Sequence, residues 1–154
     1  MNKIKVLIIG KNSFIGTNLY TYLKKKYFVK KLSFNKKILK SLKNYDVVIN
    51  CSINKKYIKY KYDKKNDFDF KIIKEITDSK TRFIFLSTRK IYFPKSNIRE
   101  NSNKKFLDTY GKNKFITEKK IQQYHSNKST ILRISNLIGF KKKNIKKVHS
   151  TYLD

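Results

Sequence analysis

The feature that most constrains this chain is the alternation of five short strand-like runs with four stretches of helical pattern. The strand-like runs are Lys5–Ile9, Phe28–Phe34, Asp46–Cys51, Arg82–Ser87 and Thr130–Ile134. The helical stretches are 14–25, 36–44, 67–78 and 109–124, and the segments 53–66 and 93–108 are expected to be loops. Strands that alternate with helices pair in parallel through right-handed crossovers. The pattern therefore predicts an α/β fold, a doubly wound parallel sheet of about five strands.

Two of the runs indicate a sheet that is covered on both faces. Val47–Ile49 and Phe83–Leu86 are continuously apolar, as strands buried on both sides require. The length of 154 residues fits one domain with a sizeable core. A doubly wound sheet binds its ligand at the carboxyl ends of the strands, so the motifs that follow those ends are the candidates for function.

The formal charge of +29 has two interpretations. Such a charge is typical of proteins that bind nucleic acids or anionic surfaces. However, the basic residues are nearly all lysines scattered from end to end, and arginine, which makes the bidentate contacts to bases, is rare. We therefore favour the compositional bias of an AT-rich genome and expect no specific nucleic-acid partner. A basic nucleic-acid-binding protein is the alternative.

Other compositional features limit the environment of the chain. Cys51 is the single cysteine, which excludes an intramolecular disulfide and a multi-cysteine metal site. No run of about 18 apolar residues is present, so no transmembrane helix is expected. The apolar run before Gly10 is too short for a signal peptide. We expect a cytoplasmic protein with no bound metal and no membrane partner.

A phosphate-binding loop is predicted between the first strand-like run and the first helix. Gly10 ends the apolar run, and Gly16 follows within an amphipathic stretch. Ser13 stands where dinucleotide-binding loops usually have their middle glycine. Such a loop binds pyrophosphate through backbone N–H groups at a helix N-terminus. Ser13 keeps its N–H and is a good N-cap, so the substitution leaves this chemistry in place.

Four later segments follow the loop in a fixed order. They are Asn50-Cys51-Ser52; Leu86-Ser87-Thr88 with Ile91-Tyr92; Tyr110-Gly111-Lys112-Asn113-Lys114 with Glu118; and Leu132–Gly139. Tyr-x-x-x-Lys pairs arise by chance in a chain so rich in both residues. The evidence for a family is the fixed order in which these segments follow the loop. The chain resembles the NAD-dependent epimerase/dehydratase family, extended short-chain dehydrogenase/reductases that act on nucleotide sugars. The resemblance runs from Lys3 to about Phe140 and implies a Rossmann-like fold.

The resemblance assigns catalysis to Thr88, Tyr110 and Lys114. Tyr110 and Lys114 are four residues apart and share one face of a helix, where a lysine ammonium favours the tyrosine phenolate. Tyr110 would exchange a proton with a sugar hydroxyl or ketone while hydride moves to or from the nicotinamide. Thr88 would hydrogen-bond the reacting oxygen, and Asn136 would help to bind the substrate.

The resemblance also implies a set of cofactor contacts. They are Gly10, Ser13, Phe14, Ile15 and Gly16 at the pyrophosphate, Cys51 and Ser52 along the cofactor, and Lys114 at the nicotinamide ribose. Residues 33–37 include no acid to bind the ribose hydroxyls of NAD, whereas Lys36 could accept the 2′-phosphate of NADP. We expect NAD or NADP, with a lean to NADP. Arg89 and Lys90 stand where some dehydratases have an acidic pair, which favours an epimerase or reductase.

Members of this family are usually much longer and carry a C-terminal substrate domain. We therefore expect residues 1–154 to form the NAD(P)-binding domain alone, from a truncated or split enzyme with little activity by itself. The expected partners are a nucleotide-sugar substrate and either a second copy, paired through the helix of Tyr110, or a complementing chain. A non-catalytic nucleotide-binding remnant is the alternative to an enzyme.

Overall fold

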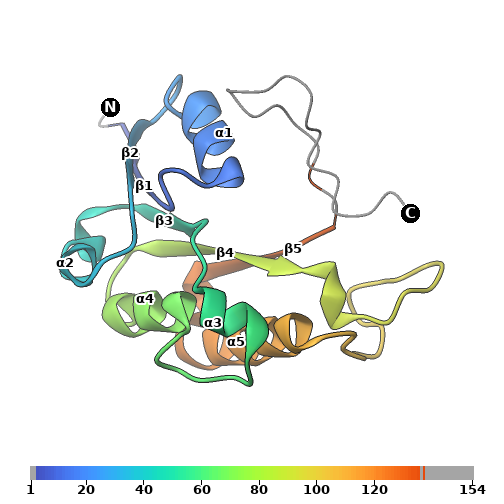
Figure 1. Ribbon diagram of the computed structural model, residues 1–154. Helices are drawn as coiled ribbons and strands as arrows, with labels where there is room; N and C mark the ends of the chain where they lie inside the picture. Colours follow the sequence, from blue (N-terminus) through green and yellow to red (C-terminus); the bar gives the residue numbers. More distant parts are fainter. Residues whose placement is uncertain (1–2, 136, 138–154) are drawn as a thin grey trace.

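A five-stranded parallel sheet in the order β2-β1-β3-β4-β5 organises the protein (Figure 1). The computed structural model describes residues 3–135 and residue 137. The strands are β1 (Lys5–Ile9), β2 (Phe28–Leu32), β3 (Val47–Asn50), β4 (Arg82–Thr88) and β5 (Ser129–Ile134). The helices are α1 (Phe14–Leu23), α2 (Lys36–Leu39), α3 (Lys55–Lys59), α4 (Phe68–Ile76) and α5 (Thr109–His125). The predicted doubly wound, Rossmann-like α/β fold is confirmed.

Helices cover both faces of the sheet (Figure 1). On one face, α1 packs on a buried cluster of Val6, Ile8 and Ile49. On the other face, α2, α4 and α5 enclose the larger cluster, Leu7, Ile9, Ile38, Leu42, Val48, Ile72, Ile73, Ile76, Phe83, Phe85 and Ile121. β1 and β3 supply side chains to both clusters, which explains why their sequences are continuously apolar.

The path of the chain across the sheet reverses at β1. This strand pairs in parallel with β2 on one side and with β3 on the other. Ile9, its last residue, is in register with Leu32 of β2 and with Asn50 of β3. The ends of β1 and β3 therefore adjoin, and the Cys51 N–H donates to the Ile9 carbonyl at 2.7 Å. This reversal is the position at which doubly wound sheets bind ligands.

Two segments differ from the sequence expectations. The helical stretch 36–44 is divided into α2 and a 3₁₀ turn at Leu42–Asn44. The expected loop 53–66 contains α3, whose N-cap Asn54 accepts the Lys56 N–H at 2.8 Å. Tyr57 anchors this helix with a side chain that is almost fully buried. Capping hydrogen bonds and one buried aromatic residue determine where these short helices form. Neither produces a periodic pattern of apolar residues that could be detected in the sequence.

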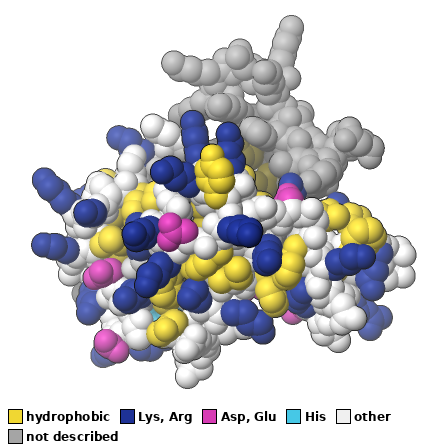
Figure 2. Space-filling model, turned by 60° about the horizontal axis from the view of Figure 1, so that its bottom comes forward, with side chains coloured by type: hydrophobic (Ala, Val, Ile, Leu, Met, Phe, Trp, Pro, Cys, Tyr) yellow, Lys and Arg dark blue, Asp and Glu magenta, His cyan; other side chains and the backbone are white. Residues whose placement is uncertain are grey.

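Two surface properties bear on what the protein contacts. Figure 2 shows lysine and arginine side chains spread over the described part of the visible face, with apolar side chains between them. On this face, the positive charge forms no single patch. Among the helices of the described residues, none is both long enough and apolar enough to cross a membrane.

Candidate functional site

The loop between β1 and α1 turns sharply at Gly10. Its φ of +104° lies in the region that favours glycine. A Cβ at this position would lie 2.8 Å from the Cys51 carbonyl carbon and 2.9 Å from the Ser52 amide nitrogen. Glycine is therefore required here, and the loop after β1 lies backbone to backbone against the segment after β3.

Gly16 and Ser13 shape the N-terminus of α1. A Cβ on Gly16 would lie 2.5 Å from the Gly10 carbonyl oxygen, so the helix packs directly on the end of β1. The Ser13 hydroxyl accepts the Gly16 N–H and donates to the Gly10 carbonyl, both at 2.9 Å. The Ser13 N–H, which we expected to face a phosphate, also donates to the Gly10 carbonyl. Phe14 and Ile15 form the first turn of α1, the end at which the helix dipole favours an anion.

Cys51 and Ser52 follow β3, opposite this loop. The Asn50 side chain holds them in place, because its Oδ1 accepts the Ser52 N–H at 3.0 Å and the Ser52 hydroxyl at 2.7 Å. Burial, with a smaller contribution from Asp69, raises the pKa of the Cys51 thiol to about 12, and Lys114 opposes the rise only in part. The thiol stays protonated at neutral pH, so Cys51 acts here as a small packing residue and not as a nucleophile.

The start of α5 is fixed against the turn that follows β4. Asp108 accepts the Gly111 N–H at 2.7 Å and forms an ion pair with Lys90 at 2.8 Å. A Cβ on Gly111 would collide with the Lys90 carbonyl oxygen. Thr88 ends β4 with a buried side chain, and its Oγ1 accepts the Lys90 N–H at 3.3 Å. These contacts bring the half-buried Tyr110 to the end of the sheet that carries Thr88.

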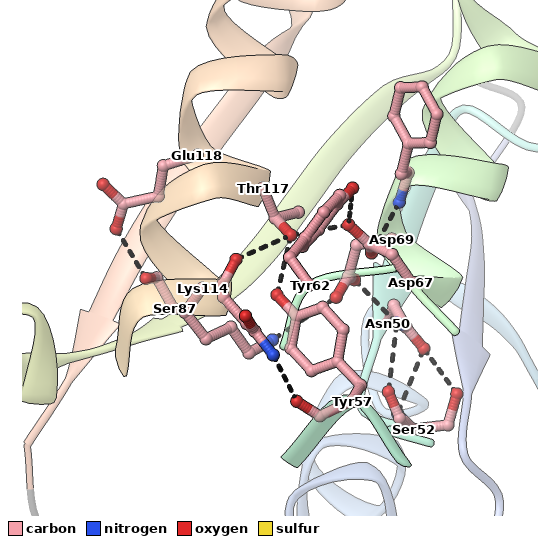
Figure 3. A network of polar contacts seen from close by, with 12 residues as sticks. Asn50, Ser52, Tyr57, Tyr62, Asp67, Asp69, Ser87, Lys114, Thr117 and Glu118 are labelled. Atoms are coloured by element: carbon pink, nitrogen blue, oxygen red, sulfur yellow. Dashed lines mark hydrogen bonds and ion pairs between the residues drawn. The ribbon is translucent and has the colours of Figure 1, made fainter. Parts of the chain in front are cut away.

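Lys114 lies one turn after Tyr110 and extends into the protein interior (Figure 3). Its side chain is 6% exposed, and its Nζ lies 3.3 Å from Asp69 Oδ2. The same Nζ lies 4.4 Å from the centre of the Phe85 ring. The ammonium is therefore held between α5, α4 and β4, and it does not extend into solvent.

A chain of hydrogen bonds continues from Lys114 to the end of β3 (Figure 3). Asp69 Oδ1 accepts a bond from Asn50 Nδ2 at 2.6 Å, and Asn50 in turn holds Ser52. Burial raises the pKa of Asp69 to about 6, against the opposing effect of Lys114. Sequence reasoning did not assign Asp69. The available signal was the presence of two acids, Asp67 and Asp69, at the start of one helix in a chain with ten acidic residues.

A second set of buried polar contacts fixes α3, α4 and α5 to one another. Asp67 Oδ2 accepts bonds from the Thr117 hydroxyl at 2.6 Å and the Tyr62 hydroxyl at 2.9 Å. Tyr57 and Thr117 share a hydrogen bond of 2.7 Å, and Asn113 Nδ2 donates to the Tyr57 carbonyl at 2.7 Å. Burial raises the pKa of Tyr57 far above its ordinary value, so the phenol stays protonated. This set holds α5 against α3 and the start of α4.

The middle of α5 is joined to the sheet by a buried carboxylate. Glu118 accepts the Ser87 hydroxyl and forms an ion pair with Arg133 at 2.8 Å. The Arg133 guanidinium also donates to the Tyr92 hydroxyl. These residues bind β4, β5 and α5 together directly behind Thr88.

A cavity of about 680 Å³ opens beside β5. Its lining includes Arg89, which follows Thr88, Leu132 of β5, and Ser135, which follows β5. Among the described residues, β5 pairs with β4 alone, and the Leu132 side chain is 46% exposed. Within the described residues, a free sheet edge and a cavity therefore lie next to the end of β4 that carries Thr88.

The structure brings most of the predicted site residues together. The residues placed around the carboxyl ends of β1, β3 and β4 are Gly10, Ser13, Phe14, Ile15, Gly16, Cys51, Ser52, Thr88, Tyr110 and Lys114. Lys36 is exposed at the first position of α2, beyond the end of β2. Asn136 lies outside the described residues. Within the described part of the chain, no group of three His, Cys, Asp or Glu side chains is placed to hold a metal ion.

A doubly wound sheet with a glycine loop at its switch point is the architecture of a Rossmann-like nucleotide-binding domain. The chain belongs to the NAD dependent epimerase/dehydratase family, which it matches over residues 29–153. The matched range begins after α1, so the interpretation of the glycine loop rests on its geometry. No curated protein matches the chain.

Solved structures of nucleotide-sugar enzymes share the fold. A dTDP-4-dehydrorhamnose reductase from Yersinia enterocolitica is 16% identical with a TM-score of 0.71, over 94% of this chain and 57% of that one. A UDP-glucuronic acid 4-epimerase from Bacillus cereus, solved with NAD, is 20% identical with a TM-score of 0.69, over 88% and 57%. A dTDP-4-dehydrorhamnose reductase from Bacillus anthracis, solved with NADP, is 19% identical with a TM-score of 0.67, over 88% and 54%. The chain thus spans little more than half the length of these enzymes.

Proposed function

We propose that this domain binds a nicotinamide dinucleotide and supports hydride and proton transfer on a nucleotide sugar, as an epimerase or reductase. The observation that carries the proposal is the position of the Lys114 ammonium. It is joined through Asp69 and Asn50 to Ser52, which lies against Gly10. Side-chain contacts thus connect two parts of the chain that the family resemblance assigns to one cofactor.

The residues present fit a dinucleotide. Gly10 allows the two loops to meet without a side chain between them, and the N-terminus of α1 lies at this junction. When bound, the nicotinamide supplies the hydride acceptor or donor. Lys114 then binds the nicotinamide ribose, Tyr110 exchanges a proton with the substrate oxygen, and Thr88 donates a hydrogen bond to that oxygen.

The choice between NAD and NADP depends on the end of β2. Residues 33–37 include no acid, and the Lys36 side chain is exposed there. We propose a preference for NADP, because an ammonium at this position attracts a 2′-phosphate. A Lys36→Ala variant should then lose affinity for NADPH and keep its affinity for NADH.

Titration with NADH and NADPH, followed by nicotinamide fluorescence, tests the proposed function directly. Saturable binding of either dinucleotide is expected. An absence of binding at millimolar dinucleotide would refute the proposal.

Turnover separates an enzyme from a non-catalytic nucleotide-binding remnant. We propose that residues 1–154 by themselves turn over little or no nucleotide sugar and that a further segment or a second chain completes the substrate site. Within the described residues, the free edge of β5 and the cavity beside it support this proposal, because an unpaired edge strand is a template for association. Activity that requires an added partner and disappears in Tyr110→Phe would identify the enzyme, whereas cofactor binding without turnover under every condition would identify the remnant.

We further propose that the protein forms homodimers through α5 and resides in the cytoplasm, and the single cysteine is in keeping with this location. Sedimentation or size-exclusion measurements at several concentrations test the dimer. A monomer at high micromolar concentration would contradict it.

A further inference from the structure

Lys114 and Asp69 form an ion pair in the interior of the protein. The two side chains are 6% and 5% exposed. A buried ammonium is costly to desolvate without an anionic partner, and Asp69 is the hydrogen-bond acceptor that the described residues provide for Lys114 Nζ. Because an ammonium has three N–H donors, this bond fixes the nitrogen and leaves donors for a ligand.

The second oxygen of Asp69 connects this pair to the nucleotide loops. Its Oδ1 accepts the Asn50 amide at 2.6 Å, and Asn50 Oδ1 accepts both the N–H and the hydroxyl of Ser52. Asp69 therefore contacts both the side chain proposed to hold the ribose and the residue that organises the segment beside the phosphate loop (Figure 3).

From this geometry we infer that Asp69 is a positioning residue for cofactor binding. It fixes the Lys114 ammonium at the level of the Asn50–Ser52 turn, so that the lysine and the phosphate loop bind the same dinucleotide. The inference rests on the proposed function, because it requires that Lys114 contacts the cofactor.

A purely structural role for Asp69 makes a different prediction, and the chain offers a matched control. Asp67 is the N-cap of the same helix and is likewise buried, and it accepts bonds from Tyr62, Thr117 and the Phe70 N–H. No contact joins Asp67 to Lys114 among the described residues. Asp67→Asn and Asp69→Asn therefore disturb the fold in similar ways, but only the second removes the charge that holds Lys114.

The experiment measures the dissociation constants of NAD⁺ and NADP⁺ by calorimetry for the wild-type chain, Asp67→Asn, Asp69→Asn, Lys114→Met and the combination of Asp69→Asn with Lys114→Met. Asp69→Asn keeps an oxygen that can accept the Asn50 amide.

We expect Asp69→Asn to weaken dinucleotide binding about tenfold, the effect of losing one hydrogen bond to a charged group. Asp67→Asn should stay within about twofold of the wild type. In the Lys114→Met background, Asp69→Asn should have no further effect, because Asp69 acts through the lysine.

The pH dependence provides a readout that a structural role would not change. The charged and titratable groups that face Asp69 are Lys114 from α5, Cys51 after β3, Tyr57 from α3, Tyr62 before α4, and Asp67 at the N-cap of α4. The pKa values of Cys51, Tyr57 and Tyr62 are all raised, so these groups stay protonated in mild acid. Wild-type affinity should fall as the pH decreases through about 6, where Asp69 is protonated. Asp67→Asn should keep a fall of this kind but shift it to lower pH, because it removes a nearby charge that helps to raise the pKa of Asp69, and Asp69→Asn should lose the fall.

The outcomes are distinct. Equal affinities of Asp69→Asn and the wild type would overturn the inference, and so would equal losses in Asp67→Asn and Asp69→Asn or an additive loss in the Lys114→Met background. If Asp69→Asn fails to fold, the wild-type pH profile and Asp69→Glu, which keeps the charge, decide the question. A wild-type chain that binds neither dinucleotide would refute the proposed function itself, and this result is visible without any variant.

Discussion

Replacement of Gly16 by alanine tests the geometry of the phosphate loop, because the two effects of the added methyl group have opposite signs. In an ordinary helix interior this change stabilises the protein by about 1 kcal/mol, since glycine is a poor helix former. At Gly16, however, the new Cβ would lie 2.5 Å from the Gly10 carbonyl oxygen and 2.7 Å from Ser13 Oγ. Both distances are well below van der Waals contact, so the end of β1 or the helix cap must move.

The net effect follows from three contributions. Forcing a methyl group into a packed site costs about 1–3 kcal/mol. Displacement of the Ser13 hydroxyl from the Gly16 N–H removes an N-cap, which is worth about 1 kcal/mol. The gain in helix propensity offsets about 1 kcal/mol. We therefore expect Gly16→Ala to lower the free energy of unfolding by about 1–3 kcal/mol and to weaken dinucleotide binding.

Urea unfolding followed by circular dichroism measures the change in stability, and Thr21→Ala on the same helix provides the control. Thr21 is exposed, and its hydroxyl bonds only to the Thr17 carbonyl one turn earlier. Its replacement should therefore change the free energy of unfolding by no more than about 0.5 kcal/mol. A Gly16→Ala variant that is as stable as the wild type, or more stable, would refute the close approach of α1 to β1.

Other perturbations act on buried groups near the same site. Glu118→Gln should destabilise by about 3 kcal/mol in urea unfolding, because it removes the anionic partner of Arg133 and disturbs the bond to Ser87; a change below about 1 kcal/mol would contradict this role. Cys51 should react slowly with a thiol reagent at neutral pH, since its pKa is raised to about 12, and rapid labelling of the folded chain would contradict the raised pKa. Because the pKa of Asp69 rises from 3.8 to about 6 on folding, its stabilising contribution is full below about pH 4 and is lost as the pH rises to about 6. Across that window the wild type should lose stability relative to Asp69→Asn, and a constant difference would contradict the shift.

The main features of the fold follow from the sequence because burial on both faces leaves a strong signal. All five strands lie where the apolar runs place them, with ends that differ by at most two residues. The glycines at positions 10, 16 and 111 were also informative, because each stands where a Cβ would meet a backbone atom. In a chain with four glycines, such positions are visible in the sequence alone.

The side-chain network could not be predicted in the same way. Asp69 and Asn50 are separated by 19 residues and Asp69 and Lys114 by 45, so their contacts depend on how α4 and α5 pack on β3 and β4. Lysine is so common in this chain that the sequence gives no reason to place one ammonium in the interior. For the same reason, the sequence does not show that the Lys114 side chain points inward. It extends toward Asp69, whereas other lysines of α5 lie on the surface.

The positions of the few acidic residues show where this lysine-rich sequence could not accept a lysine. Solvated positions accept lysine at little cost, and the chain has 39 basic and 10 acidic residues. Three of those acids, Asp67, Asp69 and Glu118, are nevertheless buried, where each accepts hydrogen bonds from groups that a lysine could not serve. Asp69 joins α4 to the end of β3, and Glu118 joins α5 to the end of β4. These strand ends carry Ser52 and Thr88, which is where a dinucleotide and its substrate would need rigid support.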